Sequence, residues 1–337
     1  MTKVAILGGS GYTAVELIKI LLRHPAVEIV AVTSRSEETP LVAELHPSLT
    51  GRLDLRCQVF QPDRLVARGV ECVFSCLPHG ASMEAIPGLL ERGLRVIDLS
   101  ADYRLRDPNV YGQWYGESHR DLAHLAQAVY GLPELYGDEL PTAQLVANPG
   151  CYPQAPILGL APLVTGRHID LKSIIIDSKS GVSGAGRTPK LDFHFPECNE
   201  SVCAYGVGKH RHTPEIEQAL TDLAGEPVEV LFTPHLIPMN RGIFSTIYVT
   251  PRRAFTDAQL LELYRAYFTQ AAFVRVLDRL PATKDCLGTN FLDLTVRCVR
   301  GRILVLVCED NLIRGASGLA VQNFNRMYGH DEKTALL

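Results

Sequence analysis

Three absences narrow the classes of protein to which this chain can belong. No apolar run approaches the roughly 18 residues of a membrane-spanning helix. No cluster of lysine and arginine offsets the net charge of -4, so there is no basic surface for nucleic acid. The N-terminus opens on an apolar strand instead of a charged leader. The sequence therefore predicts a cytoplasmic protein that binds neither membranes nor nucleic acid.

The nine cysteines lack the spacing of a metal site. There is no Cys-x-x-Cys pair, and the closest spacings, Cys72/Cys76 and Cys198/Cys203, have no partner pair at the distance of a zinc site. We therefore expect no metal centre. Four cysteines in apolar or alternating segments are expected to be inert core thiols: Cys57, Cys72, Cys298 and Cys308.

The first half of the chain alternates short apolar strands with segments of helical periodicity. In a chain of 337 residues, long enough for about two domains, this alternation predicts a doubly wound parallel sheet of the Rossmann type. The segment 102–140 is rich in Tyr, Gly and Pro and is expected to be irregular. The expected strands are 4–8, 27–33, 72–76 and 96–99, and the expected helices are 13–22 and 81–91.

After about residue 150, strands with period-two alternation follow one another mostly without helices between them. This pattern predicts an α+β domain with a mainly antiparallel sheet, including a tight hairpin at Arg300-Gly301. The predicted domains are a dinucleotide-binding domain over 1–149, completed by a C-terminal helix within 312–337, and a second domain over 150–311. The expected strands are 173–178, 228–234, 244–250, 291–298 and 303–308, with helices at 155–164, 214–223 and 257–268.

A glycine-rich run, Gly8-Gly9-Ser10-Gly11-Tyr12-Thr13-Ala14, joins the first strand to the first helix. Glycines there permit a tight turn and a close approach of the backbone to a pyrophosphate, which can bind the N–H groups at the helix N-terminus. A turn that binds nothing is the alternative, but its place between strand and helix favours cofactor binding. The predicted cofactor-binding residues are Gly8, Ser10, Gly11, Tyr12 and Thr13.

The end of the second strand bears on the choice between NAD and NADP. An acid there would hold the ribose 2′-hydroxyl, whereas this chain has Thr33-Ser34-Arg35-Ser36. A guanidinium and hydroxyl groups suit a 2′-phosphate, so Ser34 and Arg35 favour NADP. Two acids, Glu37 and Glu38, lie close by, and Arg35 taken alone is also compatible with an exposed loop charge.

Cys151 differs from the other cysteines because glycine and proline surround it, in the run Asn148-Pro149-Gly150-Cys151-Tyr152-Pro153. A cysteine at the N-terminus of the helix expected next would face the positive end of the helix dipole, which favours the thiolate and nucleophilic attack. The alternative is a small buried residue at a turn. Spacing alone leaves the two interpretations equal.

Five runs follow one another along the chain, together with Asn311 and Gly315…Gln322-Asn323 near its end. They are the glycine loop, Leu99-Ser100-Ala101-Asp102-Tyr103-Arg104, the run around Cys151, Ser180-Gly181-Val182-Ser183-Gly184-Ala185-Gly186-Arg187 and His210-Arg211-His212-Thr213-Pro214-Glu215. In this order they closely resemble the N-acetyl-γ-glutamyl-phosphate reductases of arginine biosynthesis, whose wider relatives are aspartate-semialdehyde dehydrogenases. The resemblance covers nearly the whole chain, although Ala14 stands where that pattern has glycine.

The resemblance implies the reduction of a small acyl phosphate by NADPH. Cys151 would attack the carbonyl carbon, phosphate would leave, and the thioester would accept hydride and release an aldehyde. The resemblance also implies a homodimer or homotetramer.

Two histidines are candidates for the acid or base, because imidazole titrates near neutrality. In an extended segment His210 and His212 would face the same side. We favour His212, next to the helix cap, and expect a structural or substrate-binding role for at least one of them.

The substrate and cofactor need further contacts. Arg104, just beyond a parallel strand, is expected to contact substrate phosphate, as in the relatives. Arg187 and Lys190 are candidates for phosphate or carboxylate, although solvated loop charges fit nearly as well. Gln154 would orient the substrate or cap the helix. Ser180 and Gly181 lie in a glycine-rich loop that allows close approach of backbone to cofactor, and the resemblance implies that Asn323 binds the nicotinamide amide.

Three other functions compete with this one. A reductase of carrier-bound acyl phosphates would need a basic surface for its acidic carrier, which this mildly acidic chain lacks. An aspartate-semialdehyde dehydrogenase is disfavoured by the His210–Glu215 run. A cofactor-binding regulator without catalysis would have little use for Cys151 and a histidine pair.

Overall fold

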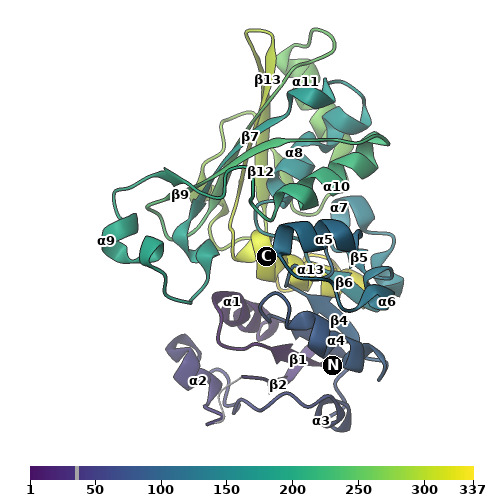
Figure 1. The fold of residues 1–337 in the computed structure, drawn as a ribbon, viewed down its shortest axis with the longest axis vertical. Helices are drawn as coiled ribbons and strands as arrows, with labels where there is room; N and C mark the ends of the chain where they lie inside the picture. The colour runs from purple at the N-terminus through teal and green to yellow at the C-terminus, as the bar shows by residue number, and fades with distance from the viewer. Residues whose placement is uncertain (35–37) are drawn as a thin grey trace. The chain divides into compact units, whose positions relative to one another are not determined.

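The computed structural model describes residues 1–34 and 38–337. The chain divides into two compact units (Figure 1). The first contains residues 1–150 and 316–337, and the second contains residues 151–315. Within the described residues, no helix combines the length and the apolar character that crossing a membrane requires.

The first unit is built on a parallel sheet of six strands in the order β2-β1-β3-β4-β6-β5. Every strand pair in it is parallel, which confirms the predicted Rossmann-type sheet. Helices cover both faces of such a sheet, so its inner strands are apolar throughout instead of alternating. The strands are β1 (Thr2–Leu7), β2 (Val27–Val32), β3 (Cys72–Ser75), β4 (Arg95–Asp98), β5 (Val129–Tyr130) and β6 (Leu145–Ala147).

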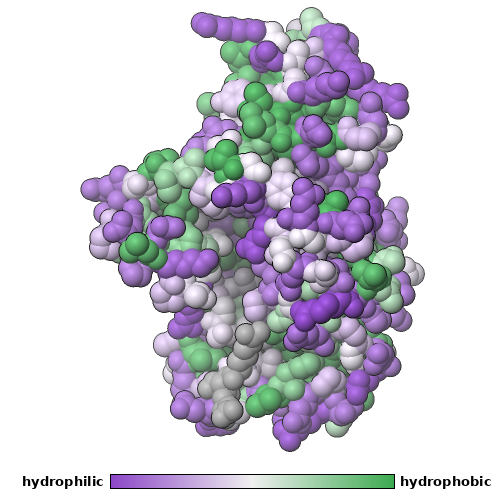
Figure 2. Space-filling view, in the orientation of Figure 1, coloured by the Kyte–Doolittle hydropathy of each residue, from purple (hydrophilic) through white to green (hydrophobic). Residues whose placement is uncertain are grey.

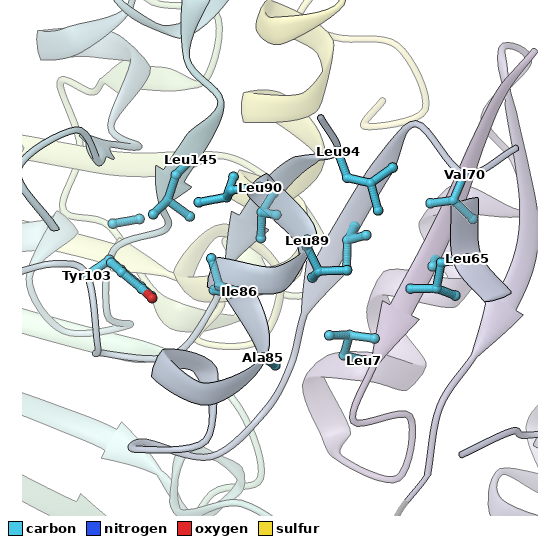
Figure 3. Close-up of a cluster of buried hydrophobic side chains, with 14 of the residues drawn as sticks. Leu7, Leu65, Val70, Ala85, Ile86, Leu89, Leu90, Leu94, Tyr103 and Leu145 are labelled. Carbon is cyan, nitrogen blue, oxygen red and sulfur yellow. The ribbon is translucent and has the colours of Figure 1, made fainter. Parts of the chain in front are cut away.

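One core of this unit forms between α4 (Ser82–Leu90) and the sheet. Ala85, Ile86, Leu89 and Leu90 recur at helical spacing and pack with strand residues such as Leu7 (Figure 3). Each fully buried leucine contributes roughly 2 kcal/mol to stability. Further helices of this unit are α1 (Tyr12–Leu21), α2 (Val42–Leu45), η1 (Pro47–Leu49), α3 (Pro62–Ala67), η2 (Leu140–Thr142) and α13 (Gly318–Met327).

The segment 102–140 is more regular than its composition indicates. It contains three short helices and the edge strand β5. Asp107 and Asp121 cap the first two helices by accepting hydrogen bonds from the main-chain N–H of Asn109 and of His124. The expectation of an irregular region was therefore wrong, because local caps outweigh the turn-rich composition. The helices are α5 (Pro108–Tyr115), α6 (Leu122–Leu125) and α7 (Pro133–Tyr136).

The second unit is built on a mixed, mostly antiparallel sheet of seven strands in the order β11-β12-β13-β10-β7-β9-β8. Only the β7–β9 and β11–β12 pairs are parallel, so the predicted α+β domain is confirmed. The predicted hairpin at Arg300-Gly301 joins two antiparallel strands. In its turn Arg300 has φ +49° and Gly301 has φ +77°. The strands are β7 (Ile175–Gly181), β8 (Cys203–Ala204), β9 (Leu231–Ile237), β10 (Ile243–Val249), β11 (Val274–Val276), β12 (Leu292–Val299) and β13 (Arg302–Glu309).

Helices cover one face of this sheet (Figure 1). Helix α8 packs on β10 and β13 and is buried at every position from Gln154 to Val164. On the other face the strands carry partly exposed residues, and four of them, Leu304, Tyr248, Ile175 and Leu231, form a row across β13, β10, β7 and β9. The helices are α8 (Gln154–Thr165), α10 (Thr213–Ala224), α11 (Asp257–Tyr267), α9 (Phe195–Cys198), α12 (Thr283–Cys286) and the short turns η3 (Leu171–Ser173), η4 (Val182–Ala185) and η5 (Leu191–Phe193).

The excursion around α9 exposes apolar side chains. Figure 2 shows green atoms among hydrophilic ones on this part of the second unit. Leu191, Phe195, Val202 and Val207 are all more than half exposed there.

Candidate active site

The glycine loop between β1 and α1 has no room for side chains at its first two positions. Gly8 has φ +76°, and a Cβ atom there would lie 2.6 Å from the carbonyl oxygen of Cys76. A Cβ atom on Gly9 would lie 2.4 Å from Cγ1 of Val32. Both glycines are therefore required by the close packing of the loop against β2 and the end of β3.

Helix α1 presents a suitable anion site at its N-terminus. Its N-cap residue is Gly11, no side chain caps its first N–H groups, and no acid lies in its first turn. Uncapped N–H groups and the positive end of the helix dipole favour a phosphate. Ser10 and Tyr12 are exposed beside this turn, and Thr13 is half-buried. Ala14 is fully buried, so its methyl group fits where the family pattern has glycine.

His46 supports the same loop and was missed in the sequence. Its Nε2 lies 2.7 Å from the carbonyl oxygen of Gly9, and the ring is 6% exposed. Because a carbonyl oxygen only accepts, Nε2 carries the proton and donates it. A single histidine separated from the glycine run by tens of residues has no sequence signal that would reveal this contact.

The end of β2 also contacts the glycine loop. Gly9 donates its N–H to the carbonyl oxygen of Thr33 at 2.8 Å, and Gly8 donates to the Thr33 hydroxyl at 3.3 Å. Ser34 follows and donates its N–H to the carbonyl oxygen of Gln58 at 3.2 Å. Arg35 lies outside the described residues.

Arg104 is buried and held between two strand ends. Its Nε donates to the carbonyl oxygen of Asn148 and its Nη2 to that of Leu99, both at 2.8 Å. The guanidinium therefore lies beside Asn148, which precedes Cys151 by three residues in the chain.

Two buried carboxylates fix the run that ends in Arg104. Asp102 accepts hydrogen bonds from the N–H groups of Gly80 and Met83 and from the hydroxyl of Tyr111. Asp98 accepts from the hydroxyls of Ser82 and Ser100, while burial raises its pKa to about 6. These bonds join the residues at the start of α4 to the run that precedes the arginine.

Asn323 projects from α13 toward the end of β6. Its Nδ2 donates to the carbonyl oxygen of Gly131 at 2.9 Å and to Oδ1 of Asn148 at 3.0 Å. Its own Oδ1 is buried and has no hydrogen-bond partner. Leaving a buried acceptor unsatisfied costs roughly 1–3 kcal/mol, so this oxygen suits an amide N–H of a ligand. With the glycine cradle and the open end of α1, it fits a nicotinamide dinucleotide.

Cys151 is the first residue of the second unit and is half-buried. It lies in the turn 151–153, and Pro153 is the N-cap of α8. Cys151 therefore lies two residues before the N-cap, and not in the first turn of the helix. Gln154 is fully buried at the first helical position of α8.

Most of the other cysteines have the properties of core thiols. Burial raises the pKa of Cys72, Cys76 and Cys286 to about 12, and it also raises those of Cys57 and Cys308. A thiol with such a pKa is protonated near neutral pH and is a poor nucleophile. The predicted inertness of Cys57, Cys72 and Cys308 agrees with this, whereas Cys298 is only half-buried.

The two histidines meet in a turn and not in the extended segment that was expected. Thr213 donates its N–H to the carbonyl oxygen of His210 at 2.9 Å, which closes the turn. The ring centroids of His210 and His212 are 4.9 Å apart. The ring of Tyr152, the residue after Cys151, lies 5.5 Å from that of His210 and 6.0 Å from that of His212. His212 is the N-cap of α10, which begins at Thr213.

The His210 ring is held in one neutral form. Its Nδ1 lies 3.2 Å from the main-chain N–H of His212, and it must accept that hydrogen bond. Burial, aided by the charge of Arg211, lowers the pKa of His210 to about 4. His210 is therefore neutral at physiological pH, with its proton on Nε2.

The loop after β7 is packed against the protein's own backbone. A Cβ atom on Gly181 would lie 2.7 Å from the carbonyl oxygen of Asn240, so this glycine is required without any cofactor. Asn311 holds the loop, since its Nδ2 donates to the Ser183 hydroxyl and its Oδ1 accepts from the N–H of Gly242. The hydroxyl of Ser180 is buried and donates to the carbonyl oxygen of Gly181.

Arg187 and Lys190 follow this loop and are both exposed. Their positions fit a solvated loop as well as a ligand contact. Of the described residues, no group of three or more His, Cys, Asp and Glu side chains is placed to bind a metal ion.

Family comparisons divide the chain as its fold does. Residues 3–143 match the family described as semialdehyde dehydrogenase, NAD binding domain, and residues 151–311 match semialdehyde dehydrogenase, dimerisation domain. Among solved structures, aspartate semialdehyde dehydrogenase II of Vibrio cholerae, complexed with ASA, has a TM-score of 0.73 at 16% identity and covers 98% of each chain. The enzyme of Candida albicans with NADP has the same TM-score at 15% identity, covering 97% of this chain and 98% of its own.

Curated relatives are much more similar in sequence. The N-acetyl-gamma-glutamyl-phosphate reductase of Citrifermentans bemidjiense is 51% identical over 100% of this chain and 98% of its own length. That of Rhodopirellula baltica is 47% identical over 99% of this chain and 98% of its own length. At this identity over full length, the chain belongs to the N-acetyl-gamma-glutamyl-phosphate reductase family of oxidoreductases.

Proposed function

We propose that this protein reduces N-acetyl-L-glutamyl 5-phosphate to N-acetyl-L-glutamate 5-semialdehyde and phosphate in arginine biosynthesis, in the cytoplasm. The observation that carries the mechanism is the placement of Cys151 next to Tyr152, whose ring contacts both His210 and His212. The full-length similarity to reductases of that name supports the substrate.

The chemistry proceeds through a thioester on Cys151. His212 takes the thiol proton, and the sulfur attacks the acyl carbon while the bond from that carbon to the phosphate oxygen breaks. A dihydronicotinamide held by the first unit would supply hydride to the thioester carbon. The resulting thiohemiacetal anion would collapse to the aldehyde as the carbon–sulfur bond breaks, and the departing thiolate would regain its proton from His212.

His212 is the better acid or base of the two histidines. The lowered pKa of His210, about 4, leaves it without a proton to lose near neutrality, and its Nδ1 is occupied by the N–H of His212. A base in this reaction must change its protonation state near the working pH. His210 instead fixes the backbone from which the His212 ring projects.

The cofactor is held by the first unit, with a preference for NADP. The N-terminus of α1 would bind the pyrophosphate, with Ser10, Tyr12 and Thr13 beside it, and Oδ1 of Asn323, which lacks a partner among the described residues, would accept from the nicotinamide amide. Ser34 and Arg35 would bind the 2′-phosphate. An Arg35→Ser variant should lose most of its preference for NADP over NAD, and equal wild-type rates with both cofactors would refute the preference.

Arg104, Arg187 and Lys190 are assigned to bind the phosphate and carboxylate groups of the substrate, and Gln154 is assigned to orient its acyl group. Arg104 is the strongest of these because two carbonyl oxygens fix its guanidinium beside the chain that leads to Cys151. Gln154 is buried at the start of the helix that follows the cysteine.

A second copy of the chain is the expected partner, giving a homodimer or homotetramer. The second unit matches a dimerisation domain. The row of Leu304, Tyr248, Ile175 and Leu231 on the helix-free sheet face offers apolar area, and Tyr248, Ile175 and Leu231 are 38%, 42% and 59% exposed. A two-fold axis on this face would bury the same row from both protomers.

The function is tested by the reverse reaction, in which NADP+, phosphate and N-acetyl-glutamate semialdehyde are mixed with the protein and absorbance of NADPH is followed. Absorbance should rise with this aldehyde and not with aspartate semialdehyde. Cys151→Ala should abolish the signal, whereas Cys203→Ala, at an exposed cysteine of the same unit, should leave it unchanged. No rise with the first aldehyde would refute the substrate, and full activity of Cys151→Ala would refute the thioester.

A further inference from the structure

A π-helical turn packs directly against Cys151. The turn, η6 (Ile313–Ser317), forms where Gly315 donates its N–H to the carbonyl oxygen of Asp310 at 2.8 Å, five residues earlier. A Cβ atom on Gly315 would lie 3.0 Å from Cβ and 3.3 Å from Cα of Cys151. The backbone of Gly315 therefore packs directly against Cys151. Single π turns are rare and frequently lie at functional sites.

Space, and not backbone conformation, requires a glycine at this position. Gly315 is absent from the glycines with positive φ, so any L-residue could adopt its main-chain conformation. What excludes a side chain is Cys151 itself, together with the carbonyl oxygen of Asp310 at 3.3 Å. Because the nearest obstacles are the cysteine's own Cα and Cβ, an added methyl group would displace the nucleophile or the turn.

Asp310 folds the turn that presents this glycine. Its side chain is fully buried, and Oδ1 accepts the N–H groups of Leu312 at 2.8 Å and Ile313 at 3.1 Å. Oδ2 accepts the N–H of Gly288 at 2.8 Å and lies 3.5 Å from Nη1 of Arg241. One carboxylate therefore satisfies the first donors of the turn and anchors it to the segment before β12.

We propose that Gly315 and Asp310 are positioning residues for Cys151: Asp310 holds the π turn in place, and Gly315 lets its backbone pack on the nucleophile so that the sulfur is fixed for attack. This proposal rests on the proposed role of Cys151. A nucleophile must be held within a few tenths of an ångström of its productive position, and a displacement of about 1 Å can cost on the order of 100-fold in rate.

The test compares Gly315→Ala with the control Gly159→Ala. A Cβ atom on Gly159 would also meet its nearest atom, Cγ2 of Val307, at 3.0 Å, but in the packing of α8 on the sheet. We expect Gly315→Ala to lower kcat at least about tenfold with the KM for NADP+ unchanged within about twofold. Gly159→Ala should keep the wild-type kcat even if its melting temperature falls.

The cysteines supply a second readout in the same samples. Iodoacetamide labelling is followed for each cysteine by mass spectrometry, with exposed Cys203 as the reference and buried Cys308 as a sensor of unfolding. Gly315→Ala should slow Cys151 relative to Cys203 at least about threefold, because the methyl group covers part of a half-exposed thiol, while Cys308 stays unlabelled. If Cys308 becomes labelled in Gly315→Ala, Asp310→Asn replaces it, with the same loss of kcat expected.

The outcomes separate this proposal from the proposed function. Wild-type kcat and wild-type Cys151 labelling in folded Gly315→Ala or Asp310→Asn would overturn the positioning role while Cys151→Ala is inactive. Full activity of Cys151→Ala would overturn the thioester mechanism instead. A tenfold loss of kcat in Gly159→Ala would show that crowding anywhere in this unit has the same effect, and it would also overturn the proposal.

Discussion

The Nδ1 atom of His210 accepts a hydrogen bond from the main-chain N–H of His212 at 3.2 Å. This bond distinguishes two residues that are equivalent in the sequence pattern. The His210 ring is fixed by accepting it, which supports the proposal that His212 is the residue that exchanges protons.

Substitution of the two histidines should therefore have unequal effects. His212→Asn should lower kcat by about 10²- to 10⁴-fold, the usual contribution of a general acid or base. His210→Asn should lower it less than about tenfold, because the Asn side-chain oxygen can still accept the N–H of residue 212. Steady-state kinetics at pH 7 distinguish the two. A larger loss in His210→Asn would exchange the roles.

Stability should fall in mild acid because of His210. Its pKa is about 4 in the folded chain against 6.5 for an ordinary histidine, so the unfolded chain binds the proton first. The cost is absent above pH 6.5 and develops as the pH falls from 6.5 to 4, reaching roughly 2 kcal/mol after allowance for a half-buried ring.

Urea unfolding at pH 4.5 and 7.5 measures this effect. His210→Asn should reduce the difference in unfolding free energy between the two pH values. The control His194→Asn replaces an exposed histidine of the same unit and should leave the difference as in the wild type. An undiminished difference in His210→Asn would contradict the assignment.

Loss of the His46 contact should weaken cofactor binding. His46→Phe removes the donor to the carbonyl oxygen of Gly9, and we expect the Kd for NADPH to rise about tenfold, as for the loss of a hydrogen bond worth roughly 1.4 kcal/mol. Fluorescence titration of NADPH measures it. His24→Phe is a matched control, since His24 is also buried in the same unit but bonds to Asn325. Equal weakening in both variants would indicate general destabilisation.

A charge in the apolar row of the second sheet should dissociate the oligomer. Tyr248→Glu places a carboxylate between Ile175 and Leu304, where a second copy would bury it without a partner. Light scattering after gel filtration should give a lower molar mass than for the wild type. Val66→Glu, at an exposed apolar residue of α3, should not change the mass. An unchanged mass in Tyr248→Glu would place the interface elsewhere.

The sheets could be predicted from the spacing of apolar residues, because the burial of each strand face determines which positions are apolar. The apolar strands of the first unit, and the alternating β10 and β13 of the second, could be predicted since each face of a strand meets one environment. Two of the helices between residues 102 and 140, α5 and α6, could not, because Asp107 and Asp121 cap them individually inside a composition typical of loops.

Candidate site residues could be identified from the sequence where neighbours in the chain are neighbours in space. Cys151 with its prolines and the histidine pair are such local patterns, and their roles remain proposals. His46 acts on Gly9, and Gly315 packs on Cys151, across separations that no local pattern reports. The expectation of an extended segment at His210 was wrong. Nδ1 of His210 accepts the main-chain N–H of His212, and the segment forms a turn.

The burial of α8 has a consequence for how activity is lost. This helix, which follows Cys151, has no exposed residue between Gln154 and Val164. Its amide protons should exchange with solvent only when the whole second unit opens, because no local fraying exposes them. Cys151, the proposed nucleophile, thus precedes a segment that should be among the slowest-exchanging of the unit, and inactivation by denaturant should coincide with cooperative unfolding instead of preceding it.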